Sequence, residues 1–206
     1  MARIIRTALV DNQVELGDLK NVMEFGCSNA RVLRHFEDMA QSNNYWGCDI
    51  NANTILWNLG NLAPPFQFFV STTLPSLPFR DSHFDLAFAN SVFTHMDDML
   101  FTWLLEMKRI VRDGGYLFLT FLNEPSVQFG LENPNRPVGK QILNNRELID
   151  DLMKGTYNMV VINRDADSMT YIRQDFLREY LGRMFEVVAI VEKTMAGHQT
   201  GYLLKN

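Results

Sequence analysis

Hydrophobic residues along the chain follow two alternating spacings. Short, nearly continuous apolar runs typical of buried strands occur at residues 21–25, 45–49, 66–70, 84–88 and 116–122. Between them, apolar residues recur every three or four positions after Ser28, after Asn51 and after Asp97, and again at residues 176–184, which predicts amphipathic helices there. Strands that alternate with helices at this pitch indicate an α/β fold, with a mostly parallel, doubly wound sheet covered by helices on both faces.

The end of the chain departs from this alternation. Strands predicted at residues 185–191 and 202–204 are joined by a turn around Gly197, with no helix between them. So short a connection cannot bring a strand back to a parallel position, so the closing pair is expected to be antiparallel. The 206 residues fit one domain with a single buried core.

Residues 123–170 form a polar excursion from the alternating pattern, with prolines at 125, 134 and 137. Within it, one helix is predicted at residues 146–154 and a strand at residues 159–162. A long excursion at the carboxyl end of a parallel strand is where α/β proteins place lids and substrate contacts. We therefore expect an inserted lid on the substrate side of the domain, although a peripheral decoration is an equally open interpretation.

The composition of the chain argues against several kinds of binding partner. The chain has 19 Lys and Arg against 24 Asp and Glu, a formal charge of −5 and no basic cluster, which argues against a nucleic-acid partner. No stretch approaches ~18 consecutive apolar residues, and the N-terminal apolar residues are too broken for a signal peptide, so we expect a cytoplasmic protein without a membrane segment. Cys27 and Cys48 form no disulfide framework, and no residues have metal-ligand spacing, so no metal is expected.

Two features point to a ligand that contains ribose. The first predicted strand ends in Glu24-Phe25-Gly26-Cys27-Ser28-Asn29-Ala30 and leads directly into a helix, and small residues at such a turn let backbone N–H groups approach a ligand. Asp49 follows at the end of the second strand, 23 residues after Gly26, where a carboxylate can accept hydrogen bonds from both ribose hydroxyls.

Longer motifs in the same order resemble those of a known family. They are VMEFGCSNARVLRHF (22–36), YWGCDIN (45–51), LPSLPFRDSHFDLAFANSVFTHM (74–96), WLLEMKRIVRDGGYLFLTF (103–121) and GHQTGYLLKN (197–206). Together they resemble the class I, Rossmann-like S-adenosylmethionine-dependent methyltransferases of the small-molecule type. The resemblance is close over residues 21–121 and looser from Phe185 to the end. It implies a seven-stranded sheet whose last strand is antiparallel.

The resemblance also implies a cofactor, S-adenosyl-L-methionine, and the residues that would hold it. Glu24 and the backbone from Gly26 through Cys27 to Ser28 would surround its methionine portion. Asp49 would hold the ribose hydroxyls, and Ile50 would pack on adenine. Further along, Thr72 and Thr73 would lie near the adenine amino group, and Asn90 and Ser91 beside the reactive sulfonium.

This chain differs from the family pattern at the glycine-rich turn. Ser28 and Ala30 stand where the family usually has glycine, and a Cβ there can crowd the ligand or require a less permissive backbone. Thr72 and Thr73 also replace the acidic residue that often contacts adenine. A cofactor-binding protein of the same fold that has lost its activity is therefore the alternative to an enzyme. A nicotinamide oxidoreductase is a third hypothesis, disfavoured because only Gly26 remains of its three-glycine pattern.

His95 is the candidate catalytic residue. Methyl transfer to a hydroxyl requires removal of a proton, and His95 follows the fourth strand on the expected substrate side. Its structural interpretation is a hydrogen bond that organises the loop before the Asp97 helix. His198 is a weaker candidate, and His35 and His83 are expected at the surface. The function predicted is methyl transfer to a small-molecule or sugar-like acceptor at oxygen; the sequence predicts neither the acceptor nor the oligomeric state.

Overall fold

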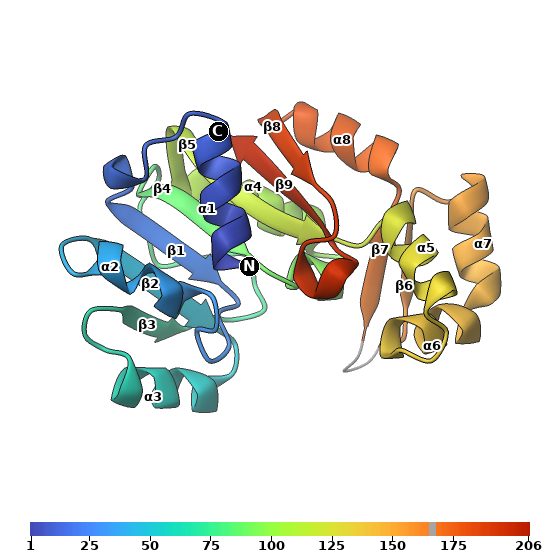
Figure 1. Ribbon diagram of the computed structural model, residues 1–206, viewed down its shortest axis with the longest axis horizontal. Coiled ribbons are helices and arrows are strands. Elements are labelled where there is room, and N and C mark those ends of the chain that lie inside the picture. The colour runs from blue at the N-terminus through green and yellow to red at the C-terminus, as the bar shows by residue number, and fades with distance from the viewer. Residues whose placement is uncertain (165–167) are drawn as a thin grey trace.

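A computed structural model describes residues 1–164 and 168–206. Seven strands form the main sheet in the spatial order β3-β2-β1-β4-β5-β9-β8 (Figure 1). Their bounds are β1 (Asn21–Phe25), β2 (Asn44–Asp49), β3 (Gln67–Val70), β4 (Phe84–Ala89), β5 (Val111–Phe121), β8 (Glu186–Val191) and β9 (Thr200–Lys205). Strands β1 to β5 pair in parallel, whereas β9 is antiparallel to both β5 and β8. The predicted fold class, including the antiparallel closing pair, is confirmed.

Helices cover both faces of this sheet. Among the described residues they are α1 (Ala2–Asp11), α2 (Glu37–Ala40), α3 (Ala52–Asn61), α4 (Leu100–Ile110) and α8 (Gln174–Gly182), with short 3₁₀ turns η1 (Leu16–Asp18), η2 (Leu33–Phe36), η3 (Phe93–His95) and η4 (Met195–Gly197). Figure 1 shows α1 in front of the sheet and α4 behind it. None of the helices in these two described stretches is long and apolar enough to cross a bilayer.

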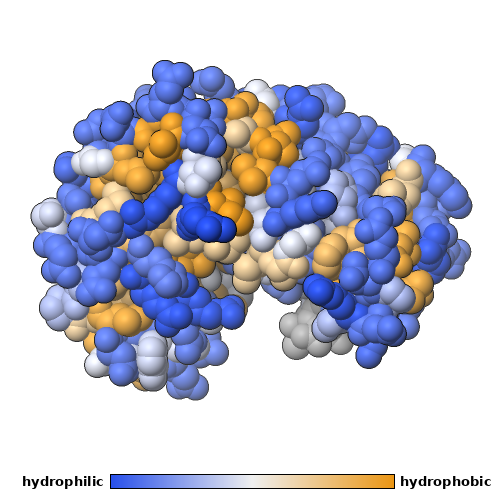
Figure 2. All heavy atoms as spheres, in the orientation of Figure 1, coloured by the Kyte–Doolittle hydropathy of each residue, from blue (hydrophilic) through white to orange (hydrophobic). Residues whose placement is uncertain are grey.

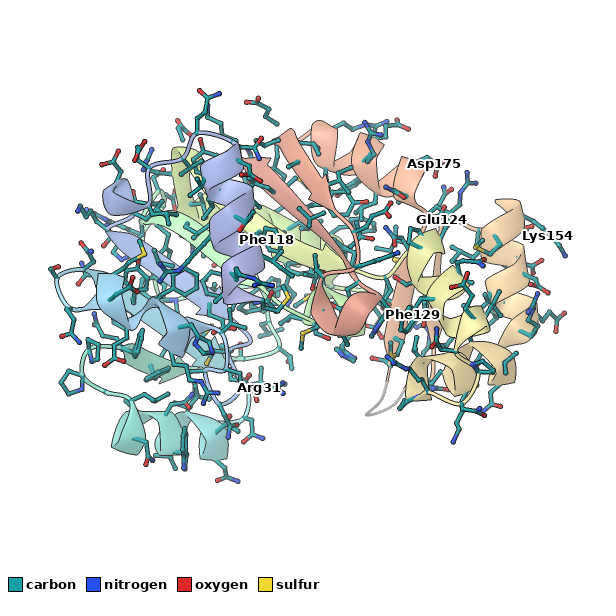
Figure 3. All side chains as sticks on the ribbon, viewed as in Figure 1. Arg31, Phe118, Glu124, Phe129, Lys154 and Asp175 are labelled. Atoms are coloured by element: carbon teal, nitrogen blue, oxygen red, sulfur yellow. The ribbon has the colours of Figure 1, made fainter. Side chains whose placement is uncertain are left out.

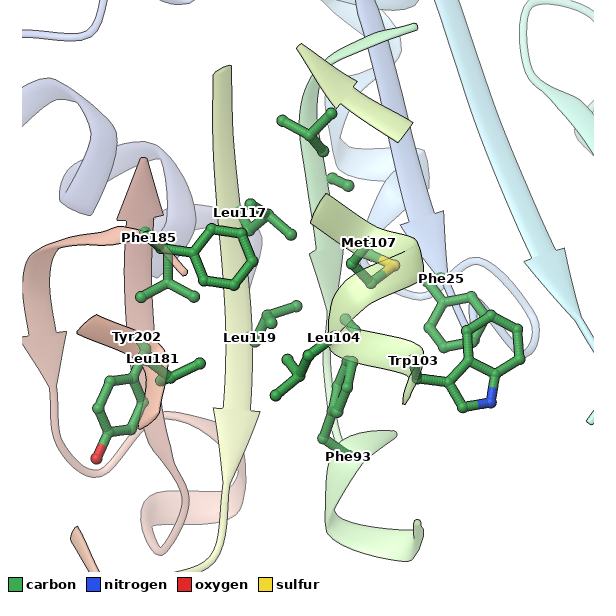
Figure 4. Close-up of a cluster of buried hydrophobic side chains, with 14 of the residues drawn as sticks. Phe25, Phe93, Trp103, Leu104, Met107, Leu117, Leu119, Leu181, Phe185 and Tyr202 are labelled. Atoms are coloured by element: carbon green, nitrogen blue, oxygen red, sulfur yellow. The ribbon is translucent and has the colours of Figure 1, made fainter. Parts of the chain in front are cut away.

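Two hydrophobic cores lie on the two faces because successive strand residues point to opposite sides. Leu104 and Met107 of α4 and Leu181 of α8 pack with Leu117 and Leu119 of β5, as Figure 4 shows. The other face collects residues from α1, η2 and α3, namely Ile5, Leu9, Leu33, Phe36 and Ile55. The helix predicted after Ser28 is wrong in length, since only a turn, η2 and α2 form there, but its predicted apolar residues are buried.

The excursion after β5 is a compact insert with a core of its own. It contains α5 (Glu124–Glu132), α6 (Pro137–Asn144), α7 (Arg146–Lys154) and the antiparallel pair β6 (Met159–Ile162) and β7 (Met169–Ile172); residues 165–167 lie outside the described part. The predicted helix and strand are confirmed at their predicted bounds. Its nine buried core residues are Leu122, Val127, Val138, Ile142, Ile149, Leu152, Val160, Ile162 and Tyr171.

The two ends of the insert lie side by side. Leu122 pairs with Tyr171 as an isolated bridge, and the Ile172 N–H donates to the Leu122 carbonyl over 2.9 Å. The insert therefore leaves the main sheet after β5 and returns at the same place before α8. The space-filling view shows a hollow between the main unit and the insert (Figure 2).

Candidate functional site

The turn after β1 has a left-handed backbone at three positions. Gly26 has a φ of +69°, and a Cβ built there would lie 2.4 Å from Val92 Cγ2, so only glycine fits. Ser28 and Ala30 have φ values of +46° and +50°, although L-residues other than Asn and Asp rarely adopt this region. The chain thus keeps a backbone conformation suited to glycine at both positions where the family's glycines are replaced.

Hydrogen bonds from neighbouring elements hold this turn in place. The Cys27 N–H donates to the Cys48 carbonyl over 2.8 Å, and the Ser28 N–H donates to Asp49 Oδ2 over 2.8 Å. The other carboxylate oxygen of Asp49 accepts the Asn51 N–H over 2.9 Å. Both oxygens of Asp49 are therefore fixed by backbone donors, each with a lone pair left for a ligand.

The Asn58 side chain also fastens the turn, by donating to the Ser28 carbonyl over 2.7 Å. Asn58 belongs to α3, which begins after Asn51. The Asn51 side chain accepts the Asn53 and Thr54 N–H groups and so caps the N-terminus of this helix. The turn after β1, Asp49 and the start of α3 thus form one hydrogen-bonded unit at the carboxyl ends of β1 and β2.

Glu24 and Cys27 are buried beside the turn, and neither is among the residues that line the cleft described below. The Glu24 side chain is buried, and its Oε2 accepts the Leu33 N–H over 2.8 Å. Burial raises the pKa of Glu24 to about 8, against smaller lowering effects of this N–H group and of Arg31. The Asn90 amide also lowers this pKa, although no hydrogen bond of normal geometry joins the two side chains. Burial likewise raises the pKa of the Cys27 thiol, so both groups are neutral at pH 7.

A cleft of about 570 Å³ opens in front of the turn, at the carboxyl ends of the parallel strands. The strand order reverses between β1 and β4, and α/β sheets bind ligands at such a switch point. Nine residues predicted from the sequence line the cleft: Gly26, Ser28, Asp49, Ile50, Thr72, Thr73, Asn90, Ser91 and His95. The sequence did not single out its other main lining residues, Arg31, Ser71, Val92, Met96, Met99, Trp103 and Met195.

Asn90 and Ser91 form the floor of the cleft after β4. The side-chain oxygen and nitrogen of Asn90 are buried without a hydrogen-bond partner in the described part of the chain. Buried polar atoms are normally paired, so this amide is available for a polar ligand. Ser91 has a φ of +57°, and its Oγ accepts a hydrogen bond from Gln199 Nε2 over 2.9 Å.

The insert orients His95. The imidazole Nδ1 lies 2.8 Å from the Ser168 carbonyl, and the Ser168 hydroxyl donates back to the His95 carbonyl over 3.1 Å. Thr170 Oγ1 also donates to the Met96 carbonyl. A carbonyl only accepts, so Nδ1 carries the proton, and in the neutral ring Nε2 is left with a free lone pair.

The other histidines lie elsewhere. The His198 ring stacks on Phe129 of α5 with centroids 5.5 Å apart, and burial lowers its pKa. His35 lies on η2 and His83 stacks on Phe79, and neither lines the cleft. Among residues 1–164 and 168–206, no three His, Cys, Asp or Glu side chains are grouped as metal ligands.

Glu106 and Arg109 lie three positions apart on one helix, a spacing that predicts an exposed ion pair, but in the structure the pair is partly buried. Arg109 donates to both oxygens of Glu106, each over 2.7 Å, and the Glu106 side chain is only 7% exposed. Glu106 Oε1 also accepts the Leu77 N–H. The pair therefore fixes the loop before β4, and the prediction of an exposed ion pair is wrong because the sequence did not show which loop covers α4.

The strand order, the cleft at the switch point and the antiparallel β9 are those of the Rossmann-like, class I methyltransferase fold. Residues 23–119 match the family model described as a methyltransferase domain. Residues 23–119 thus carry a methyltransferase domain, and the described chain has the fold of S-adenosylmethionine-dependent methyltransferases.

Solved structures with this fold span nearly the whole chain. An S-adenosylmethionine-dependent methyltransferase from Methanosarcina mazei is 19% identical and has a TM-score of 0.63. The match covers 95% of this chain and 94% of that protein. The 1,6-didemethyltoxoflavin-N1-methyltransferase of Burkholderia thailandensis, solved with bound 1,6-didemethyltoxoflavin and S-adenosylhomocysteine, is 14% identical and has a TM-score of 0.66. The match covers 98% of this chain and 77% of that protein. Magnesium protoporphyrin IX methyltransferase from Synechocystis PCC 6803, with bound SAH, is 14% identical and has a TM-score of 0.64. The match covers 100% of this chain and 81% of that protein.

Proposed function

We propose that this protein transfers a methyl group from S-adenosylmethionine to a hydroxyl oxygen of a small-molecule or sugar-like acceptor. The observation that carries the proposal is the turn after β1, which is hydrogen-bonded to Asp49 and lies beside the cleft at the switch point of the sheet. Its left-handed backbone at Ser28 and Ala30 supports a ligand-binding turn in spite of the missing glycines. Two structural neighbours named above were solved with the demethylated cofactor bound, which favours the same cofactor here.

The residues of the cleft fit the polar parts of this cofactor. The Asp49 carboxylate has lone pairs for ribose hydroxyls, and the exposed Ile50 side chain offers an apolar surface for adenine. The Asn90 amide, which has no hydrogen-bond partner among the described residues, lines the same cleft and is available to the methionine portion. When bound, the cofactor supplies a methyl group activated by a positively charged sulfur, which leaves as a neutral sulfide.

His95 is the group we assign to proton removal. His95 would accept the hydroxyl proton of the acceptor at Nε2, and the resulting imidazolium would lose this proton to solvent. The Ser168 carbonyl stabilises this imidazolium through the Nδ1–H bond of 2.8 Å. The insert thereby acts as the acceptor-side wall of the same domain.

Binding and transfer are tested in sequence. Calorimetric titration should give micromolar binding of S-adenosylmethionine and S-adenosylhomocysteine and none of NAD. A panel of phenolic, sugar and amine acceptors, assayed for methyl transfer, then identifies the acceptor class. Cofactor binding without transfer to any acceptor would support the non-catalytic alternative, and a preference for amines would overturn the assignment of oxygen.

A role for His95 as base predicts a specific kinetic pattern. His95→Gln should lower kcat by about 10²- to 10⁴-fold, with the affinity for S-adenosylhomocysteine unchanged, because the amide cannot accept a proton. His198→Gln is the matched control, since His198 does not line the cleft. Full activity of His95→Gln would restrict His95 to holding the loop against the insert.

A further inference from the structure

Residues 50–79, which include α3 and β3, contain no charged side chain. None of these 30 residues is Asp, Glu, Lys or Arg, and no other uncharged run in the chain is half as long. Charged residues make up 21% of the chain, so a stretch of this length would ordinarily contain about six. Exposed charges are found on other elements, such as Lys154 of α7 and Asp175 of α8 (Figure 3). One end of the molecule is therefore neutral, although the formal charge of the whole chain is −5.

β3 is the edge strand of the main sheet at this neutral end. In the described part of the chain it pairs only with β2, and Figure 1 shows it at the end of the sheet beside α3. The Ser71 N–H donates to the Asp49 carbonyl over 3.0 Å, so the backbone groups of odd-numbered residues here face β2. The N–H and C=O groups of Phe68 and Val70 therefore point outward, where another strand can pair with them.

The two edges of the sheet differ in their protection against such pairing. Native edge strands usually carry charges or prolines that prevent association with another chain. β8, the other edge strand, begins with Glu186 and is followed by Glu192 and Lys193. β3 contains neither a charge nor a proline, since Pro64 and Pro65 lie before its first residue. An edge without these features indicates a strand that is covered in the working protein.

The side of α3 above this edge is apolar. Asn58 points from α3 to the turn after β1, that is, toward the middle of the sheet. Leu56 and Leu59 are turned about 160° and 100° away from Asn58 around the helix axis, which is the side of the open edge. Their side chains are 66% and 43% exposed, and Val70 of β3 is 48% exposed. Apolar side chains thus flank the outward backbone groups of β3.

We propose that a second copy of this chain pairs with β3 across a twofold axis, so that the two sheets continue into one. In an antiparallel pair, Phe68 of one copy exchanges hydrogen bonds with Val70 of the other, and the reverse, with the axis at Phe69. This axis is perpendicular to the sheet and keeps both α3 helices on the same face. Leu56 and Leu59 of the two copies then pack against each other.

Charge favours a second copy as the occupant of this surface. Two chains of charge −5 repel each other, but their neutral ends can meet without bringing like charges together. Residues 50–79 offer a charged partner no group for an ion pair, whereas their backbone edge and apolar side chains are complementary to themselves. The proposal goes beyond the proposed function and does not depend on it, because no ligand takes part.

Sedimentation velocity of the ligand-free protein tests the proposal. At micromolar concentration the wild type should sediment with twice the mass of one chain. Val70→Pro removes an N–H that faces away from β2, and edge strands tolerate proline at such positions, so this variant should stay folded by circular dichroism and sediment as a monomer. Leu56→Glu brings two carboxylates together at the axis and should weaken the dimer at least tenfold.

Leu105→Glu is the matched control, because Leu105 is also an exposed leucine on a helix but belongs to α4. It should dimerise as the wild type does. Higher salt should tighten the wild-type dimer by screening the net charges. A wild-type monomer throughout the concentration series would overturn the proposal and leave this surface to a different protein. A dimer that survives both Val70→Pro and Leu56→Glu would overturn it as well, and Leu56→Glu alone decides if Val70→Pro fails to fold.

Discussion

Glu24 couples the stability of the fold to pH. Its side chain is 3% exposed, and burial raises its pKa from 4.5 to about 8. Between these two values the folded protein keeps a proton that the unfolded chain has already lost. The stabilisation is therefore fully present below pH 4.5, falls as the pH rises, and is lost once the pH has passed the folded pKa of about 8.

The expected magnitude follows from the two pKa values. Within this window the free energy of unfolding should fall by up to about 1.4 kcal/mol per pH unit, which amounts to about 4 kcal/mol between pH 5 and pH 8.5. Glu24→Gln removes the titration and keeps an oxygen that can accept the Leu33 N–H. The variant should therefore lose less stability than the wild type over the same range.

Urea unfolding of both proteins without ligand, at pH 5, 6, 7, 8 and 8.5, measures the difference directly. The free energy of unfolding of Glu24→Gln minus that of the wild type should increase steadily across the series. Other titrating groups affect both proteins alike and cancel in this difference. A difference that stays constant with pH would refute the reasoning, because Glu24 would then titrate near its ordinary pKa in the folded protein.

Two further predictions concern the turn after β1. Asp49→Asn should weaken S-adenosylhomocysteine at least tenfold in calorimetry, or about 1.4 kcal/mol, while the protein stays folded by circular dichroism; unchanged affinity would exclude Asp49 as the ribose partner. Gly26→Ala should cost about 3 kcal/mol of unfolding free energy, since it combines a φ of +69° with a contact of 2.4 Å to Val92 Cγ2. Adding Val92→Ala to the Gly26→Ala variant should recover only the part of this free energy that is due to the contact with Val92. Strictly additive effects of the two substitutions in urea unfolding would contradict this explanation.

Local sequence signals were sufficient for part of the fold. Helix α7 ends where predicted because Gly155 takes a left-handed φ of +82° after an amphipathic stretch. Helices α5 and α6 were missed because prolines and asparagines suggested loops, yet Pro125 lies in the first turn of α5 and Asn123 forms a capping box with Ser126. Helix α1 was missed because its apolar residues were considered only as a possible leader.

The candidate site, too, could be predicted only in part from the sequence. Residues next to strand ends, such as Asp49 and Asn90, could be found because the topology places strand ends together. Met195 lines the cleft from η4, more than 140 residues further along the chain than Asp49, and no local pattern marks it. The hydrogen bond from His95 to the Ser168 carbonyl also depends on how the insert folds back, which sequence spacing does not encode.

A hydrogen bond between Leu122 and Ile172 joins the two ends of the insert, so the insert can be replaced as a unit. A segment whose two ends are adjacent can be exchanged for another of different length without moving the strands on either side. The turn after β1 is held by hydrogen bonds from β2 and α3, and among the described residues none of these bonds comes from the insert. In the function proposed above, the cofactor and the acceptor are bound by separate stretches of the chain, so a change of acceptor during evolution would require replacement of only one contiguous segment.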